Sequence, residues 1–127
     1  EDKNSPYINE LNSDIIPQLE NLLLCIENKM DVQKFNAKVF FFTQTVEYMQ
    51  NEYEGKPEIN FISFKKLQEL GNHAKSVATL RQEAEKYKPY LAYTGAGYLY
   101  NENTINQQLD YLKTEIEETI VILKEAR

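Results

Sequence analysis

Four stretches of the chain place apolar residues alternately three and four positions apart, and this spacing limits the fold more than any other feature. Such spacing puts side chains on one face of an α-helix, whereas a half-buried strand needs strict alternation of apolar and polar residues. We therefore expect an all-α protein whose core is built from one face of each of four helices. The four stripes are Ile8, Leu11, Ile15, Leu19, Leu22, Ile26 and Met30; Phe35, Val39, Phe42, Val46, Met49 and Tyr53; Phe64, Leu67, Leu70, Ala74, Val77, Leu80 or Arg81, Ala84 and Tyr87; and Ile105, Leu109, Leu112, Ile116, Ile120 and Leu123.

Capping and helix-breaking residues indicate where each helix begins and ends. Pro17 would disrupt the interior of a helix, because proline lacks an N–H and clashes with the carbonyl group four residues before it. We therefore expect Ser13 to cap the first long helix, with Pro17 in its first turn and a short helical turn before Ser13. Asp31 is expected to cap the second helix, and Thr104, in a capping box with Gln107, the fourth. The predicted helices span about 14–29, 31–54, 62–87 and 104–126.

The chain length suits one domain with one continuous core, because 127 residues is close to the commonest domain size. Four helices joined by short links pack antiparallel. We predict a single domain over residues 1–127 that forms an antiparallel, up-down-up-down four-helix bundle. The alternative is a three-helix domain that swaps or extends its N-terminal helix in a homodimer. The helical pattern continues up to Arg127, and no initiator methionine precedes Glu1, so we expect a segment excised from a longer chain.

Charge and hydropathy argue against two classes of partner. With 14 basic and 20 acidic side chains the net charge is −6, so the phosphate backbone of a nucleic acid would be repelled. No apolar run approaches the roughly 18–20 residues of a membrane span. We expect a soluble, acidic protein that neither binds nucleic acid nor inserts into a membrane within this segment. The basic stretch 56–88 lies between acidic ones and is expected to complement them across helices.

Residues of the kinds that carry catalysis or hold metals are few and scattered. The single cysteine, Cys25, falls on the first apolar stripe and is expected in the core, which leaves no disulfide or zinc motif. The acids of the fourth helix lack the Glu-x-x-His pairs of di-iron bundles and are interpreted as a solvated face. These acids are Asp110, Glu115, Glu117 and Glu118. We therefore predict no metal, no cofactor and no enzymatic activity.

His73 is the only histidine and lies on the flank of the third stripe. The stretch His73-Ala74-Lys75-Ser76 resembles histidine phosphotransfer domains, which are acidic four-helix bundles of about this size with the phosphorylated histidine on a bundle helix. In that family a lysine stands three positions after the histidine and a glycine follows, whereas here Lys75 stands two positions after it and Gly71 precedes it. The resemblance covers one helical turn and the general architecture, and it implies that His73 accepts a phosphoryl group.

Residues 88–103 form the longest predicted link and the most unusual part of the sequence. Five of the nine tyrosines fall within it or just before it, and each offers a large apolar ring with a polar tip. Loops longer than about 12 residues in compact domains tend to be functional or disordered. The rings either cap the end of the core or bind a ligand or protein partner, and the glycines let the backbone turn. The predicted binding residues are Tyr90, Tyr93, Gly95, Gly97, Tyr98 and Tyr100.

These observations favour a non-enzymatic binding domain, and they leave three hypotheses open. The first is a ligand- or partner-sensing domain of a receptor, which would lie outside the cytoplasm between membrane helices of a longer chain. The second is a stand-alone cytoplasmic adaptor, chaperone or immunity-type protein that binds a protein partner. The third is a histidine phosphotransfer domain that uses His73.

Overall fold

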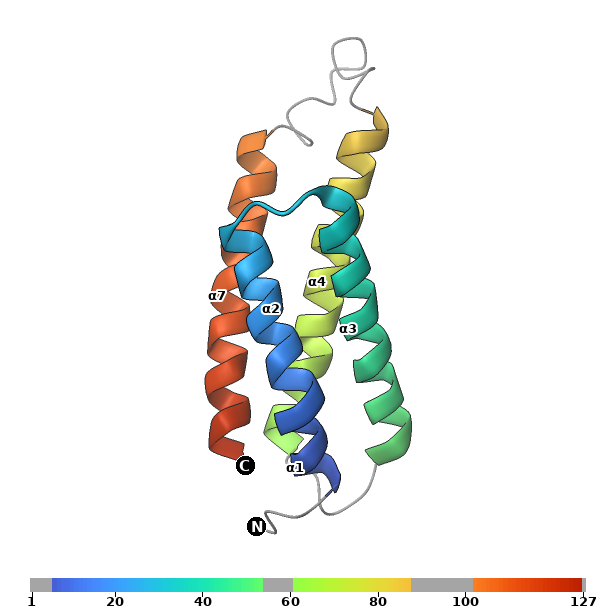
Figure 1. Cartoon of the computed structure of the whole chain (residues 1–127), viewed down its shortest axis with the longest axis vertical. Helices are drawn as coiled ribbons and strands as arrows, with labels where there is room; N and C mark the ends of the chain where they lie inside the picture. The colour runs from blue at the N-terminus through green and yellow to red at the C-terminus, as the bar shows by residue number, and fades with distance from the viewer. Residues whose placement is uncertain (1–5, 54–60, 88–101, 127) are drawn as a thin grey trace.

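The computed structural model describes residues 6–53, 61–87 and 102–126, and every element within them is a helix (Figure 1). The all-α prediction is confirmed for these residues. The predicted bounds of the last three helices differ from those in the structure by at most two residues. The elements are α1 (Pro6–Glu10), the π-helical segment η1 (Leu11–Ile15), α2 (Ile16–Glu27), α3 (Val32–Tyr53), α4 (Phe61–Tyr87) and α7 (Glu102–Ala126).

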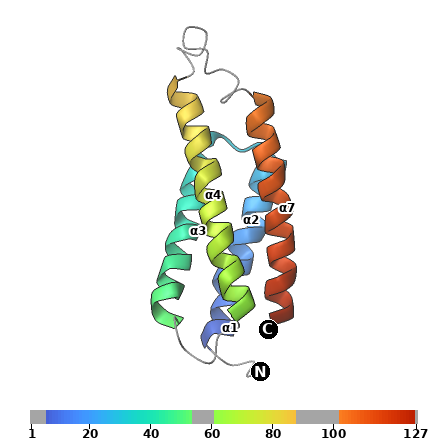
Figure 2. The same cartoon turned by 180° about the vertical axis from the view of Figure 1, so that it is seen from behind.

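The long helices pack side by side as a bundle in which each contacts two neighbours (Figures 1 and 2). Helix α3 packs against α2 and α4, and α7 packs against α2 and α4. Helix α1 and the C-terminal end of α7 lie at one end of the bundle. At the other end, α4 and α7 extend past the connection between α2 and α3. No helix in the described ranges is both long enough and apolar enough to cross a membrane.

The core consists of most residues of the predicted apolar stripes, together with residues next to them. Every position of the second stripe is buried, from Phe35 to Tyr53, and Cys25 is buried as a free thiol. The core also takes in Tyr7, whose hydroxyl lies 2.7 Å from the Ser63 Oγ on α4. The ring of Tyr7 meets that of Tyr53 edge to face, with ring centres 5.5 Å apart. These contacts join α1, α3 and α4 at the end of the bundle where α1 lies.

Pro17 does not end the first helix, and the prediction of a long helix that begins near residue 14 is wrong. The helix begins at Pro6 and continues to Glu27, with a π-helical segment just before Pro17. In that segment the N–H of Ile16 donates to the carbonyl of Leu11, five residues earlier. A π-turn takes up one extra residue, and Pro17 then lies in the first turn of α2, where its missing N–H does least harm.

Two of the predicted caps fail and one is confirmed. Ser13 lies inside the π-helical segment and donates its hydroxyl to the Asn9 carbonyl at 2.8 Å, so it caps no helix. Helix α7 begins at Glu102, and Thr104 therefore lies within it; an acidic residue in the first turn is favoured by the helix dipole. Asp31 is confirmed as the cap of α3, because its Oδ1 accepts the Lys34 N–H at 3.0 Å.

Candidate functional site

A cleft of about 590 Å³ opens where α4 and α7 extend past the end of α2. Its volume falls within the roughly 300–1,000 Å³ typical of small-molecule sites. Three walls enclose it: the C-terminal end of α2 with the connection that follows, the last turns of α4 and the first turns of α7. The lining residues are Cys25, Ile26, Lys29, Met30, Val32, Arg81, Ala84, Glu85, Glu102, Ile105, Asn106, Leu109 and Asp110.

The floor of the cleft is made of residues that the sequence assigns to the core. Ile26, Met30, Ile105 and Leu109 all belong to the predicted apolar stripes, yet each is only half-buried. The cause is the different reach of the helices, because α2 ends at Glu27 while α4 and α7 continue beyond it. Apolar side chains that would face a neighbouring helix face the cleft instead.

The rim of the cleft carries charges of both signs. Lys29 and Arg81 are basic, whereas Glu85 on α4 and Glu102 and Asp110 on α7 are acidic. The two α7 acids stand eight positions apart and therefore share one face of that helix, next to Ile105 and Leu109. The rim is thus acidic along α7 and basic where α2 ends.

Arg81 is already engaged by the protein. Its Nη2 donates to the carbonyl oxygen of Met30 at 3.2 Å, and its guanidinium lies 4.7 Å from the centre of the Phe35 ring. Burial lowers the pKa of Arg81, while the charges of Glu85 and Asp31 oppose that shift. Arg81 therefore fastens α4 to the α2–α3 connection at the edge of the cleft.

Lys29 closes the end of α2 in a conformation that suits glycine better. Its φ of 51° is the only positive φ of a non-glycine residue in the described chain. The N–H of Lys29 donates to the Ile26 carbonyl at 3.2 Å, and the N–H of Met30 donates to the Cys25 carbonyl at 2.9 Å. These two bonds form a Schellman motif, in which the left-handed position is usually glycine. The backbone thus carries strain at the rim of the cleft.

A second, more open cleft of about 780 Å³ lies on the α3 side of Arg81. It adds residues of α3, among them Asn36 and Phe40, to five that also line the first cleft: Lys29, Met30, Val32, Arg81 and Glu85. Asn36 is buried and its Nδ2 donates to the Ala78 carbonyl at 3.1 Å. Arg81 therefore borders both clefts.

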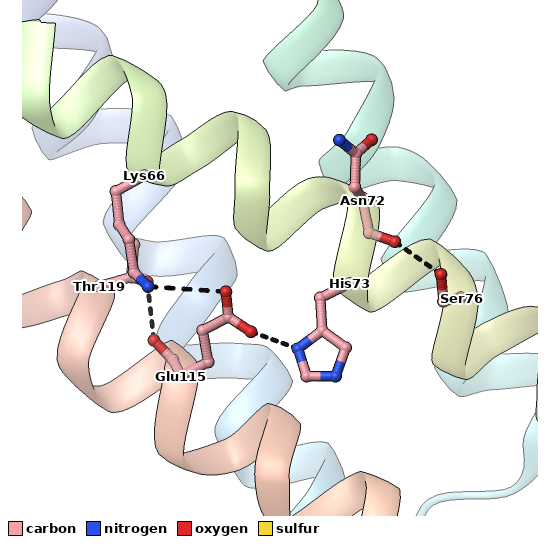
Figure 3. Close-up of polar contacts among 6 residues, drawn as sticks. All are labelled: Lys66, Asn72, His73, Ser76, Glu115 and Thr119. Atoms are coloured by element: carbon pink, nitrogen blue, oxygen red, sulfur yellow. Dashed lines mark hydrogen bonds and ion pairs between the residues drawn. The ribbon is translucent and has the colours of Figure 1, made fainter.

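His73 on α4 meets Glu115 on α7 at mid-bundle (Figure 3). Its Nδ1 contacts Glu115 Oε2, and Lys66 Nζ lies 3.6 Å from the other carboxylate oxygen. The side chains of His73 and Glu115 are 27% and 20% exposed. Figure 3 shows the second ring nitrogen of His73, Nε2, pointing away from Glu115. The carboxylate thus orients the ring and leaves Nε2 turned away from Glu115.

The interpretation of the α7 acids as a solvated face is wrong for Glu115. Asp110, Glu117 and Glu118 are exposed, but Glu115 turns toward α4 and joins Lys66 and His73. The Lys66–Glu115 pair links the basic middle of the chain to its acidic last helix, as the charge pattern predicts. Within the described ranges, no group of three or more potential metal ligands comes together.

The predicted binding residues of the tyrosine-rich loop lie outside the described residues, and their role stays a prediction. They are Tyr90, Tyr93, Gly95, Gly97, Tyr98 and Tyr100. The helices that the loop joins, α4 and α7, end and begin at the cleft. Sequence reasoning missed the cleft itself, because the apolar stripes do not show where one helix ends relative to its neighbours.

Comparison of the chain with protein-family models, with curated proteins and with solved structures finds no match.

Proposed function

We propose that this chain is a non-enzymatic binding domain of the sensor type that holds a small ligand in the cleft between α2, α4 and α7. The observation that carries the proposal is the cleft itself, with its apolar floor and charged rim. Small-molecule sites are typically concave and mostly apolar, with a few polar groups that orient the ligand.

A ligand in this position would contact α2, α4 and α7, which do not pack against one another across the cleft. Ile26 and Met30 come from α2 and the residues after it, Ala84 from α4, and Ile105 and Leu109 from α7. A molecule that buries apolar surface against all three would stabilise one relative position of the helices. Such a shift in helix packing is a means by which a bundle can report that its ligand is bound.

The antiparallel, up-down-up-down order of the helices is part of this proposal. The position of α1 and the C-terminal end of α7 at the same end of the bundle supports it. The contacts between neighbouring helices agree, because Tyr7 in α1 meets Tyr53, the last residue of α3.

The cleft can be tested by nuclear magnetic resonance with ¹⁵N-labelled protein and a library of small fragments. Fragments that bind there should shift the amide signals of Met30 and Leu109. The variant Asn106→Trp places a large ring at the exposed rim and should abolish these shifts. Thr114→Trp, an exposed position on α7 outside the cleft, should leave them unchanged. Fragments that bind only elsewhere, or that bind Asn106→Trp equally well, would contradict the proposal.

The tyrosine-rich loop is tested separately. Replacing Tyr93 and Tyr98 together by alanine distinguishes a binding role from a structural one. Lost fragment binding with an unchanged melting temperature would favour binding, whereas a lower melting temperature with binding intact would favour a lid on the core.

Phosphotransfer through His73 is a second candidate, favoured by the contact between His73 and Glu115. A carboxylate at Nδ1 orients the imidazole and leaves Nε2 as the nucleophile, which is the arrangement that histidine needs to accept a phosphoryl group. If this function is correct, incubation with a phosphorylated response regulator yields acid-labile phosphohistidine. His73→Gln must abolish that product, because the chain has one histidine. An absence of labelling in the unmodified chain rejects this candidate.

A protein partner, as in the adaptor, chaperone or immunity-type hypothesis, is the remaining alternative. It is favoured by Phe41 and Tyr48, which share one face of α3 and are 62% and 59% exposed. Aromatic rings of this kind are common at the centre of protein interfaces. Changing both to serine would weaken a protein complex and leave fragment binding in the cleft intact.

A further inference from the structure

The charges around the cleft carry an inference about the class of ligand, which rests on the proposed binding function. The basic Lys29 and the two acids of α7 come from different walls, whereas Arg81 and Glu85 both come from α4. Lys29 stands at the end of α2, and Glu102 and Asp110 stand on α7. A ligand that spans the cleft would therefore meet a positive charge at one side and negative charges at the other.

The side chains of these three residues are available to a ligand. None of Lys29, Glu102 and Asp110 takes part in an ion pair or side-chain hydrogen bond within the described part of the chain. All three are exposed. Each can therefore exchange water for a ligand group without breaking a contact seen in the structure.

The other two charges of the rim are less available. Arg81 donates to the Met30 carbonyl and lies over the ring of Phe35. Glu85 stands one helical turn after Arg81, and its charge acts on the guanidinium. Arg81 and Glu85 therefore compensate each other, and among the described residues of the rim this leaves Lys29 as the available cation.

The backbone of Lys29 gives independent support for a role of its side chain. The left-handed position of a Schellman motif is strained for lysine and relaxed for glycine. Residues with a strained backbone conformation cluster at binding sites, where the strain is part of how the site works. Lys29 lines both clefts, so its side chain is within reach of a ligand in either.

The apolar floor of the cleft indicates the chemistry of the part of the ligand that lies between its charged groups. Its apolar side chains are aliphatic or sulfur-containing, and no aromatic ring lines the cleft within the described residues. Burying the methylene groups of a ligand against such a surface favours binding. A flexible aliphatic chain fits the floor and can carry a charged group at each end.

We propose that the cleft binds a zwitterionic aliphatic molecule whose anionic group pairs with Lys29 and whose cationic group pairs with Glu102 or Asp110, the two acids of the α7 wall. The shared chemistry is an ω-amino acid or a molecule like it. A fatty anion would form an ion pair only with Lys29. An alkyl ammonium would form one only with the acidic residues of α7.

Three probes of matched length test the inference: 6-aminohexanoate, hexanoate and hexylamine. Binding is followed by the amide shifts of Met30 and Leu109 in ¹⁵N-labelled protein at low ionic strength, where exposed charges are least screened. The zwitterion should bind about fivefold more tightly than either probe with one charge, since an exposed ion pair contributes modestly to affinity. Added salt should reduce this difference.

Substitutions then show which protein side chain pairs with each charged end of the ligand. Lys29→Asn keeps a residue that tolerates the left-handed conformation but removes the charge, and it should remove the advantage of 6-aminohexanoate over hexylamine. The double change Glu102→Gln and Asp110→Asn should remove its advantage over hexanoate. Lys34→Gln and Glu118→Gln, both exposed and outside the cleft, serve as matched controls and should change neither ratio.

The outcomes separate this inference from the proposed function. If hexylamine or hexanoate binds in the cleft as tightly as 6-aminohexanoate, the zwitterion inference is wrong and the binding function stands. If the controls reduce the preference as much as the cleft variants do, the assignment of charges is wrong. If neither these probes nor the fragment library shifts the signals of the cleft, both proposals fail.

Discussion

Asn36 on α3 donates its side-chain amide to the backbone carbonyl oxygen of Ala78 on α4, at 3.1 Å, across the bundle core. The Asn36 side chain is buried, and its Oδ1 has no hydrogen-bond partner. The bond links α3 and α4 in a fixed register, while the unpaired oxygen reduces its net contribution to stability.

Asn36→Asp should lower the free energy of unfolding by about 3 kcal/mol at neutral pH. The carboxylate would be buried, would lose the donor to Ala78 and would face a carbonyl oxygen. Asn36→Leu should change it by less than about 1 kcal/mol, because the lost hydrogen bond is offset by the removal of the unpaired oxygen. Urea denaturation measures both, and Asn72→Asp, exposed on α4, is the control. An Asn36→Asp variant as stable as that control would contradict this account.

Gly71→Ala should stabilise the protein by about 1 kcal/mol. Gly71 lies inside α4, where alanine is preferred because glycine has more backbone freedom to lose. A methyl group at this position would meet Val46 Cγ1 at 4.0 Å, an ordinary contact. The packing of α4 against α3 at this position therefore does not require glycine. Thermal unfolding measures the gain, and Ala37→Gly on the exposed side of α3 should show a loss of similar size.

The helices could be predicted because burial and helical period agree along the chain. The second stripe is the clearest case. The run Val39-Phe40-Phe41-Phe42 alone resembles a strand, but Phe41 is 62% exposed while Val39 and Phe42 are buried, as a period of 3.6 requires. The spacing of apolar residues was sufficient to predict this helix, because one of its faces packs against the core along its whole length.

The π-helical segment could not be predicted from the same rules. Pro17 forbids a regular α-helix through the preceding turn, and two solutions exist: a break at Ser13 or one extra residue in the turn. The second keeps Leu11 and Ile15 facing the core on a continuous helix, and both are fully buried. The choice depends on tertiary burial, which local sequence does not reveal.

The cleft and the His73–Glu115 contact depend on relations between helices. Ile105 and Leu109 have the same spacing as buried residues further along α7, and only the earlier end of α2 exposes them. The structure gives 22 residues to α3 but 27 to α4 and 25 to α7. His73 and Glu115 each lie on the flank of a stripe, and they meet because α4 and α7 are neighbours.

Glu10→Gln should stabilise the protein at neutral pH and not at low pH. Burial raises the pKa of Glu10; a hydrogen bond from Tyr53 lowers it, and the charges of Asp14 and Glu52 raise it further. The folded state therefore binds this proton more tightly than the unfolded state, whose carboxyl group has a pKa near 4.5. The free energy of unfolding should fall as pH rises through the raised pKa of the folded state.

Glutamine keeps an acceptor for Tyr53 and removes the charge, so the Glu10→Gln variant should lack this fall. The same contact acts on the phenol, because burial and then the charge of Glu10 raise the pKa of Tyr53 to about 12. Unfolding by urea at a series of pH values between 4 and 8 measures the difference from the unmodified chain. Glu20→Gln, exposed on α2, provides the comparison. If the free energy of unfolding of Glu10→Gln and of the unmodified protein changes with pH in the same way, burial does not raise the pKa of Glu10.

Lys29→Gly should raise the free energy of unfolding by about 0.5–1 kcal/mol. The left-handed conformation costs a residue with a β-carbon about 1–2 kcal/mol, and the greater backbone freedom of unfolded glycine cancels part of the gain. Urea denaturation measures this change, with Lys75→Gly as the control. Lys75 is exposed in the middle of α4, so that change should destabilise the protein by about 1 kcal/mol. If Lys29→Gly is also destabilising, the Lys29 side chain must make stabilising contacts in the folded protein, and the strain at its backbone would no longer indicate a ligand-binding role.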